Sequence, residues 1–237
     1  MKNNSTNVAI KSPQRIPQSK LETSLTSSFQ ELYLKKDYKG AVSYLLQNKQ
    51  HLSSGIFHYN LGTVYAKMSD FPAARFHMEK ALKEGYVNSS SLNNLSYIKS
   101  QLQVDDLSSS SSMPDQIMNS ALAIPSSLYM SFTLILLIAG LIMAKSGLIK
   151  RKLSQGIGVI IILFPLCFSL FYVNKINHAI AFKEAILYEG PSKIFSEKGK
   201  ISAGSKIILG EFKEGWFYVK FPISLAGWVS KDQLGLY

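Results

Sequence analysis

The chain has 237 residues, of which 46% are hydrophobic, and it carries a formal net charge of +11. Its basic residues are spread along the whole length instead of forming one block, which argues against a nucleic-acid-binding protein. The single cysteine, Cys167, excludes an internal disulfide.

Residues 1–20 are polar, contain two prolines and show no hydrophobic periodicity, so they are predicted to be disordered. They also lack the apolar core that a signal peptide requires.

Residues 21–103 contain an internal repeat with helical character. The stretch DYKGA at residues 37–41 returns as DFPAA at residues 70–74, which is an offset of 33 residues. Repeats of this length are typical of stacked helical hairpins. The small residues Gly62 and Ala74 would let two antiparallel helices approach each other closely.

The second copy resembles a tetratricopeptide repeat. The residues that carry the resemblance are Leu61, Gly62, Tyr65, Ala74 and Ala81. It implies an all-α array of two and a half repeats, about the minimum that buries a continuous core. The last half repeat is expected to be one helix, with Leu92 and Leu95 on its apolar face.

The resemblance also implies a candidate peptide groove along the first helix of each repeat. Its residues would be Gln30, Tyr33, Tyr59, Thr63, Lys67, Asn93 and Tyr97. Asn60, Asn93 and Asn94 have side chains that could hold a peptide backbone or a carboxylate. The alternative is that the repeats are a helical spacer and the groove is only solvated.

Residues 104–125 form a serine-rich linker that contains five successive serines. Its first part, residues 104–120, is predicted to be a flexible tether between the helical array and the apolar segments that follow. The Asp105-Asp106 pair has no partner in the sequence pattern, so no metal site is assigned to it.

Two apolar runs follow, at residues 126–144 and 156–173, and neither contains Asp, Glu, Lys, Arg or His. Each is close to the length that a helix needs to cross a hydrocarbon core of about 30 Å. A core helix of a soluble protein would show one polar stripe, which these runs lack. We therefore predict a transmembrane helical hairpin.

The loop at residues 145–155 decides the predicted orientation of this hairpin. It carries Lys145, Lys150, Arg151 and Lys152 and no acidic residue. Short loops rich in Lys and Arg stay in the cytoplasm, which predicts two spans of a bacterial inner membrane with both soluble domains outside. Because residues 1–20 offer no signal peptide, two alternatives stay open: a signal precedes this start, or the repeats remain in the cytoplasm.

Residues 179–237 change to a period-two pattern of short β-branched and aromatic runs, which is typical of a small barrel. Four turn motifs occur in order: Gly190-Pro191-Ser192, Gly204-Ser205-Lys206-Ile207, Glu214-Gly215-Trp216 and Gly227-Trp228-Val229. This segment resembles bacterial SH3-like domains, which implies a small all-β SH3-like barrel.

The two tryptophans of this segment are expected to differ in role. Trp228 lies in the closing strand and is predicted to be a core residue. Trp216 is predicted to be only partly buried, and together with Tyr188 it is a candidate contact for a sugar or a proline.

The order of the parts resembles the BatE-like proteins of bacterial aerotolerance operons. Those proteins combine tetratricopeptide repeats, two spans and a C-terminal SH3-like domain. The resemblance implies partners among envelope proteins, including von Willebrand A-domain proteins and a MoxR-type ATPase. The favoured hypothesis is a membrane-anchored scaffold for envelope stress tolerance; the alternative is a tether that binds peptidoglycan, with the repeats as a spacer.

No residue pattern indicates an enzyme, a cofactor or a metal. The histidines are not grouped at metal-ligand spacing: His51, His58, His77 and His178. His58 and His77 could approach each other from opposite helices, but two packed histidines are the simpler expectation. Cys167 lies in a predicted span, so cysteine-peptidase chemistry is excluded.

Overall fold

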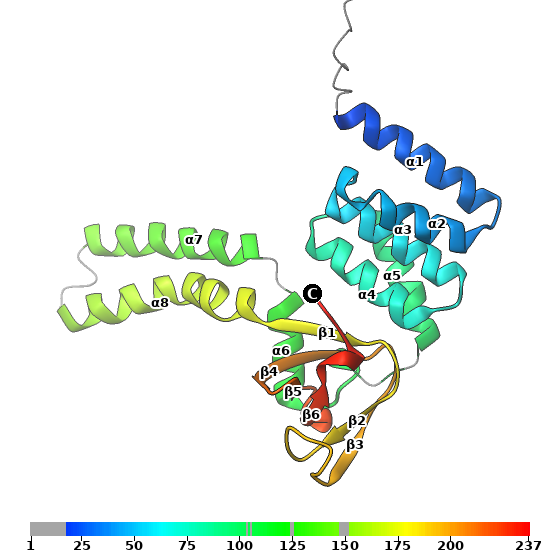
Figure 1. Cartoon of the computed structure of the whole chain (residues 1–237). Coiled ribbons are helices and arrows are strands. Elements are labelled where there is room, and N and C mark those ends of the chain that lie inside the picture. The colour runs from blue at the N-terminus through cyan, green and yellow to red at the C-terminus, as the bar shows by residue number, and fades with distance from the viewer. Residues whose placement is uncertain (1–17, 103, 105, 124–125, 147–151) are drawn as a thin grey trace, which may run out of the picture.

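The computed structural model in Figure 1 describes residues 18–102, 104, 106–123, 126–146 and 152–237. It combines a helical part with a seven-stranded antiparallel sheet, which confirms the mixed helical and β character predicted from the sequence. Most of the predicted disordered N-terminus lies outside the described residues, and helix α1 already begins at Gln18. Lys150 and Arg151 of the basic loop lie outside the described residues as well.

The helical domain consists of five helices joined by short turns. They are α1 (Gln18–Leu34), α2 (Tyr38–Gln47), α3 (Ser54–Lys67), α4 (Phe71–Lys83) and α5 (Ser89–Leu102). Asp37 caps the start of α2 by accepting a hydrogen bond from the Gly40 backbone N–H, and Asp70 caps α4 through Ala73 in the same way. The two copies of the sequence repeat therefore begin their second helices with the same local structure.

The contact between α3 and α4 explains the small residues in this repeat. A Cβ atom on Gly62 would lie 3.1 Å from the Met78 backbone nitrogen and 3.2 Å from the Ala74 carbonyl oxygen. Ala74 and Met78 are fully buried. A larger residue at position 62 would force the two helices apart.

The buried face of α5 differs from the prediction. Ile98 is fully buried and Leu95 is partly buried, whereas Leu92 is half exposed. Ser91 and Leu102 complete the face that turns inward, since they follow the helical spacing set by Leu95 and Ile98. The predicted apolar face of Leu92 and Leu95 is therefore wrong at Leu92, because Ser91 and not Leu92 faces inward.

The sheet at the C-terminal end has the strand order β3-β2-β6-β5-β4-β1-β7, and neighbouring strands are antiparallel. Its strands are β1 (Asn177–Ala181), β2 (Ala185–Tyr188), β3 (Glu197–Ile201), β4 (Lys206–Lys213), β5 (Trp216–Phe221), β6 (Gly227–Ser230) and β7 (Leu234–Leu236). The core of this β-domain contains Ile201, Ile207, Val219 and Val229, all fully buried.

Strand β6 corrects the expectation for Trp228. Gly227 and Val229 are buried, and Trp228 between them is only partly buried because successive side chains point to opposite faces of a strand. Its ring packs edge to face on Tyr218, with 5.6 Å between the ring centroids. The core residue of this motif is therefore Val229, and Trp228 lies on the outer face.

Two long helices project from the body as a hairpin, α7 (Ser126–Lys145) and α8 (Lys152–Phe171). Within the described residues, one segment is long and apolar enough to cross a membrane: Leu128–Lys145, with a mean hydropathy of 2.0. The apolar part of α8 that the structure describes, Gly156–Phe171, is shorter.

The described part of the predicted flexible tether, residues 104 and 106–120, contains a turn and most of a helix. Its serines form a turn, in which the Asp106 carboxylate accepts a hydrogen bond from the Ser108 backbone N–H at 2.8 Å. Helix α6 (Met113–Ala123) follows and packs Met118 against Ile208 of the sheet, together with Leu107. The serine-rich composition hid these apolar anchors, so the prediction of a tether was wrong.

Candidate functional site

The helical domain contains a cavity of about 450 Å³ along the first helices of the repeated hairpins, α1, α3 and α5. Its lining residues are Phe29, Tyr33, Tyr59, Asn60, Thr63, Ala66, Lys67, Asn94 and Tyr97. We call this cavity the groove. Helices α1, α3 and α5 pack so that these side chains, which come from three separate parts of the chain, line one cavity.

Five of the seven residues predicted for a peptide groove line it: Tyr33, Tyr59, Thr63, Lys67 and Tyr97. Gln30 and Asn93 are exposed and do not belong to the lining. The groove also contains Asn60 and Asn94, which the sequence had indicated as possible ligand-binding amides. Phe29 and Ala66 were missed, because both occupy positions that read as ordinary packing residues.

Asn60 is the most unusual polar residue of the groove. Its side chain is 7% exposed, and its Nδ2 atom has no hydrogen-bond partner within the described residues. An unsatisfied buried donor costs about 1–3 kcal/mol, which a carbonyl or carboxylate oxygen in the groove would recover. The neighbouring Asn94 donates only a long hydrogen bond, 3.5 Å from Nδ2 to the Tyr59 hydroxyl oxygen.

The rest of the lining suits binding better than catalysis. Aromatic rings supply apolar area, and Lys67 supplies one exposed positive charge. The Thr63 hydroxyl already donates to the Tyr59 carbonyl oxygen at 2.9 Å, so it is not a free nucleophile. An extended peptide with a carbonyl near Asn60 and an acidic group near Lys67 fits this chemistry.

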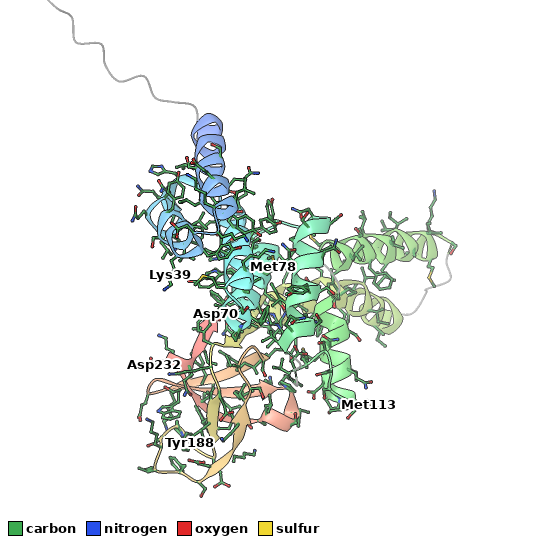
Figure 2. All side chains as sticks on the ribbon, turned by 90° about the vertical axis from the view of Figure 1, so that its right-hand side faces the viewer. Lys39, Asp70, Met78, Met113, Tyr188 and Asp232 are labelled. Atoms are coloured by element: carbon green, nitrogen blue, oxygen red, sulfur yellow. The ribbon has the colours of Figure 1, made fainter. Side chains whose placement is uncertain are left out.

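Of the two ligand contacts predicted in the β-domain, Tyr188 and Trp216, only Trp216 is accessible to a ligand. Tyr188 is 9% exposed and therefore buried, which corrects its prediction as a ligand contact. Its ring packs edge to face against Trp216, 5.5 Å between centroids, and Trp216 remains partly exposed. Figure 2 places Tyr188 on the side of the β-domain away from the α7–α8 hairpin.

A buried ionic cluster that no sequence pattern indicated lies between the helical domain and the β-domain. Arg75 of α4 is 1% exposed and donates to the Gly204 carbonyl oxygen at 2.9 Å and to the Asp106 carboxylate. Glu79, one turn later, accepts a hydrogen bond from Lys206 at 2.7 Å. These contacts join α4, the segment before α6 and the start of β4.

The charges of this cluster determine the ionisation of its acids. Burial alone would raise the pKa of Glu79, but Lys206 and Arg75 outweigh it and lower that pKa. Burial likewise opposes ionisation of Asp106, and Arg75 and Ser108 hold its pKa below the ordinary value. Both acids are therefore carboxylates at neutral pH, and the cluster is a structural contact between the two domains.

Close packing surrounds this cluster. Gly204 has a φ of +88°, and a Cβ atom there would collide with the Leu102 side chain at the end of α5. Phe76, the residue after Arg75, packs its ring edge to face on Phe182, with 5.2 Å between the ring centroids. The same ring also packs edge to face on Tyr237. The two domains are thus docked on each other and are not separate bodies joined only through the α7–α8 hairpin.

His58 and His77 meet inside the helical domain, as the sequence allowed. Their Nδ1 atoms are 2.8 Å apart, and the His77 ring stacks on Tyr65. Burial lowers the pKa of His58 to about 4 and that of His77 to about 3, and the nearby Lys80 acts in the same direction. Two neutral imidazoles can share one hydrogen bond, so the pair is a packed structural element.

The described residues contain no group of three or more His, Cys, Asp and Glu side chains that could hold a metal ion. Comparison with protein-family models, with curated proteins and with solved structures gave no match.

Proposed function

We propose that this protein is a membrane-anchored scaffold that holds a peptide segment of another envelope protein in the groove. In this proposal α1–α5 are a tetratricopeptide-repeat array, the β-domain is an SH3-like barrel, and α7 and α8 both span the membrane. The groove carries the proposal, since predicted lining residues from three helices converge there around an unsatisfied Asn60 amide. The protein would act by binding and not as an enzyme.

The proposed partners follow from the resemblance to BatE-like proteins. They are von Willebrand A-domain membrane proteins and a MoxR-type ATPase. The basic loop between α7 and α8 supports an orientation in the bacterial inner membrane with that loop in the cytoplasm. The β-domain would then lie outside.

The groove predicts a site-specific crosslink. With photoreactive benzoylphenylalanine in place of Lys67, the full-length protein should form an adduct with one partner polypeptide in native membranes. Adding Asn60→Leu, which keeps the volume but removes the donor, should reduce that adduct about 2–10-fold, as expected for one lost hydrogen bond. The adduct is identified by mass spectrometry after irradiation.

The control carries the same photoreactive residue at Lys39, an exposed position on α2. Lys39 is not among the groove residues, so this variant should give no matching adduct. Equal adducts from the two positions, or a Lys67 adduct that is indifferent to Asn60→Leu, would argue against a peptide-binding groove.

The alternative function, a peptidoglycan-binding tether, is favoured by one observation. Trp216 exposes part of its ring beside Tyr188, in an arrangement on which a sugar ring could stack. If the β-domain binds the wall, Trp216→Ala should lower sedimentation of the full-length protein with purified peptidoglycan, and Trp228→Ala should not. Identical sedimentation of both variants and the unmodified protein would exclude Trp216 as the wall contact.

A further inference from the structure

Helix α6 lies at the root of the α7–α8 hairpin and runs crosswise to it (Figures 1 and 2). Two residues separate Ala123, the end of α6, from Ser126, the start of α7. The Tyr129 hydroxyl in the first turns of α7 donates to the Ala121 carbonyl oxygen in the last turn of α6, at 3.0 Å. A direct hydrogen bond thus joins α6 to the hairpin, beyond the short chain connection.

A second set of contacts joins the other helix of the hairpin to the β-domain. Lys220 of β5 lies with its Nζ atom 5.9 Å from the ring centroid of Tyr172, just after α8. Lys175 lies 5.6 Å from the ring centroid of Phe171 in the same manner. Aromatic rings and lysines at the end of a spanning helix are typical of the headgroup level of a bilayer.

One face of α6 belongs to the β-domain. Asp115 is fully buried and accepts a hydrogen bond from the Ile223 backbone N–H at 3.1 Å. Met118 and Leu122, on the same side of the helix, pack with Ile208 and Phe221.

The opposite face of α6 is uncovered and carries two large apolar side chains among polar ones. Met113 is 73% exposed and Ile117 is 64% exposed, and they lie one helical turn apart. Figure 2 shows Met113 at the end of α6, on the side of the β-domain from which the hairpin leaves. Single exposed apolar residues need no explanation, but α6, which carries both of these, lies at the root of the hairpin, where a bilayer around α7 and α8 would begin.

We propose that α6 is a membrane-surface helix that seats the soluble body on the lipid bilayer through Met113 and Ile117. The partner of this surface is lipid at the boundary between headgroups and acyl chains, the depth at which amphipathic surface helices lie. The inference rests on the proposed membrane anchoring by α7 and α8. Because Arg75 docks the helical domain on the β-domain, a seated α6 would also fix the direction in which the groove faces.

Lipid-quenching measurements on the full-length protein test this inference. The only cysteine is first removed with Cys167→Ser, and single cysteines are then introduced as Ile117→Cys, Ile194→Cys or Ile135→Cys. Each variant is labelled with bimane and reconstituted in phosphatidylcholine–phosphatidylglycerol vesicles that contain shallow doxyl-lipid quenchers for positions 117 and 194, or deep doxyl-lipid quenchers for position 135. Ile194 is the matched control, since it is an apolar residue 88% exposed in the loop between β2 and β3.

Quenching at position 117 should be several-fold greater than at position 194, and position 135 in α7 should also be quenched. If position 135 is quenched but 117 responds no more than 194, the surface helix is wrong and the anchoring stands. If position 135 is not quenched, the membrane anchoring itself is wrong. Met113→Cys gives an independent second reading of the α6 face.

Discussion

Replacing Arg75 with methionine should destabilise the contact between the two domains by about 3–5 kcal/mol, because it leaves the buried Asp106 carboxylate without its ion-pair partner. Asp106 would lose its ion pair, and the Gly204 carbonyl oxygen would lose its donor. Hydrogen exchange of the full-length protein in nanodiscs should rise in residues 106–122 and around position 204. The thermal unfolding midpoint should fall as well.

A variant that removes both charges of the Arg75–Asp106 ion pair shows whether the loss of stability comes from the unpaired Asp106 carboxylate or from the loss of the Arg75 side chain itself. Arg75→Met combined with Asp106→Asn should recover much of the lost stability, since it removes both charges of that ion pair and leaves the Glu79–Lys206 pair intact. Lys35→Ala is the surface control, because the Lys35–Glu31 pair is exposed and should not change stability measurably. An Arg75→Met protein with unchanged exchange would show that the docking does not depend on this cluster.

The parts of the fold that were predicted correctly depend on local pattern. The close approach at Gly62 and the apolar run of α7 each follow from residues near one another in the sequence. The groove residues come from the resemblance to tetratricopeptide repeats, which implies that the first helices of successive repeats line one surface.

The parts that were missed depend on contacts between distant segments. Arg75 reads as one more charged residue of an exposed helix, and only the folded chain shows that Gly204 and Asp106 meet it. The serine-rich segment reads as a linker, because its order comes from packing against Ile208 and Phe221 of strands β4 and β5, about 90 or more residues later in the chain. Trp228 was assigned to the core by residue type, whereas strand alternation gave that place to Val229.

Acidification should weaken the helical domain between pH 6.5 and 5 through His58 and His77. In the unfolded chain these histidines bind protons below about pH 6.5, whereas in the folded chain their pKa values of about 4 and 3 keep them neutral. Their contribution to stability is therefore complete above pH 6.5 and is lost as the pH falls toward 4 and 3. Phe57 and Phe76 pack against this pair, and Lys49 and Lys80 lie over those rings. These two lysines oppose an imidazolium, and the one acid of α4 outside its caps, Glu79, is engaged with Lys206 and Arg75.

The double variant His58→Leu/His77→Leu isolates this effect. Replacing both partners leaves no unpaired nitrogen, so the variant should be close to the unmodified protein in stability at pH 7.5. Between pH 6.5 and 5 the unmodified protein should lose on the order of 2 kcal/mol more than the variant. The lowered pKa values of Asp106 and Glu79 confine their own loss of stability to lower pH, and His178 is present in both proteins and cancels in the difference. Urea unfolding of the full chain in detergent, followed by helical circular dichroism, measures the two curves; parallel curves across this range would mean that the histidine pair carries no pH dependence.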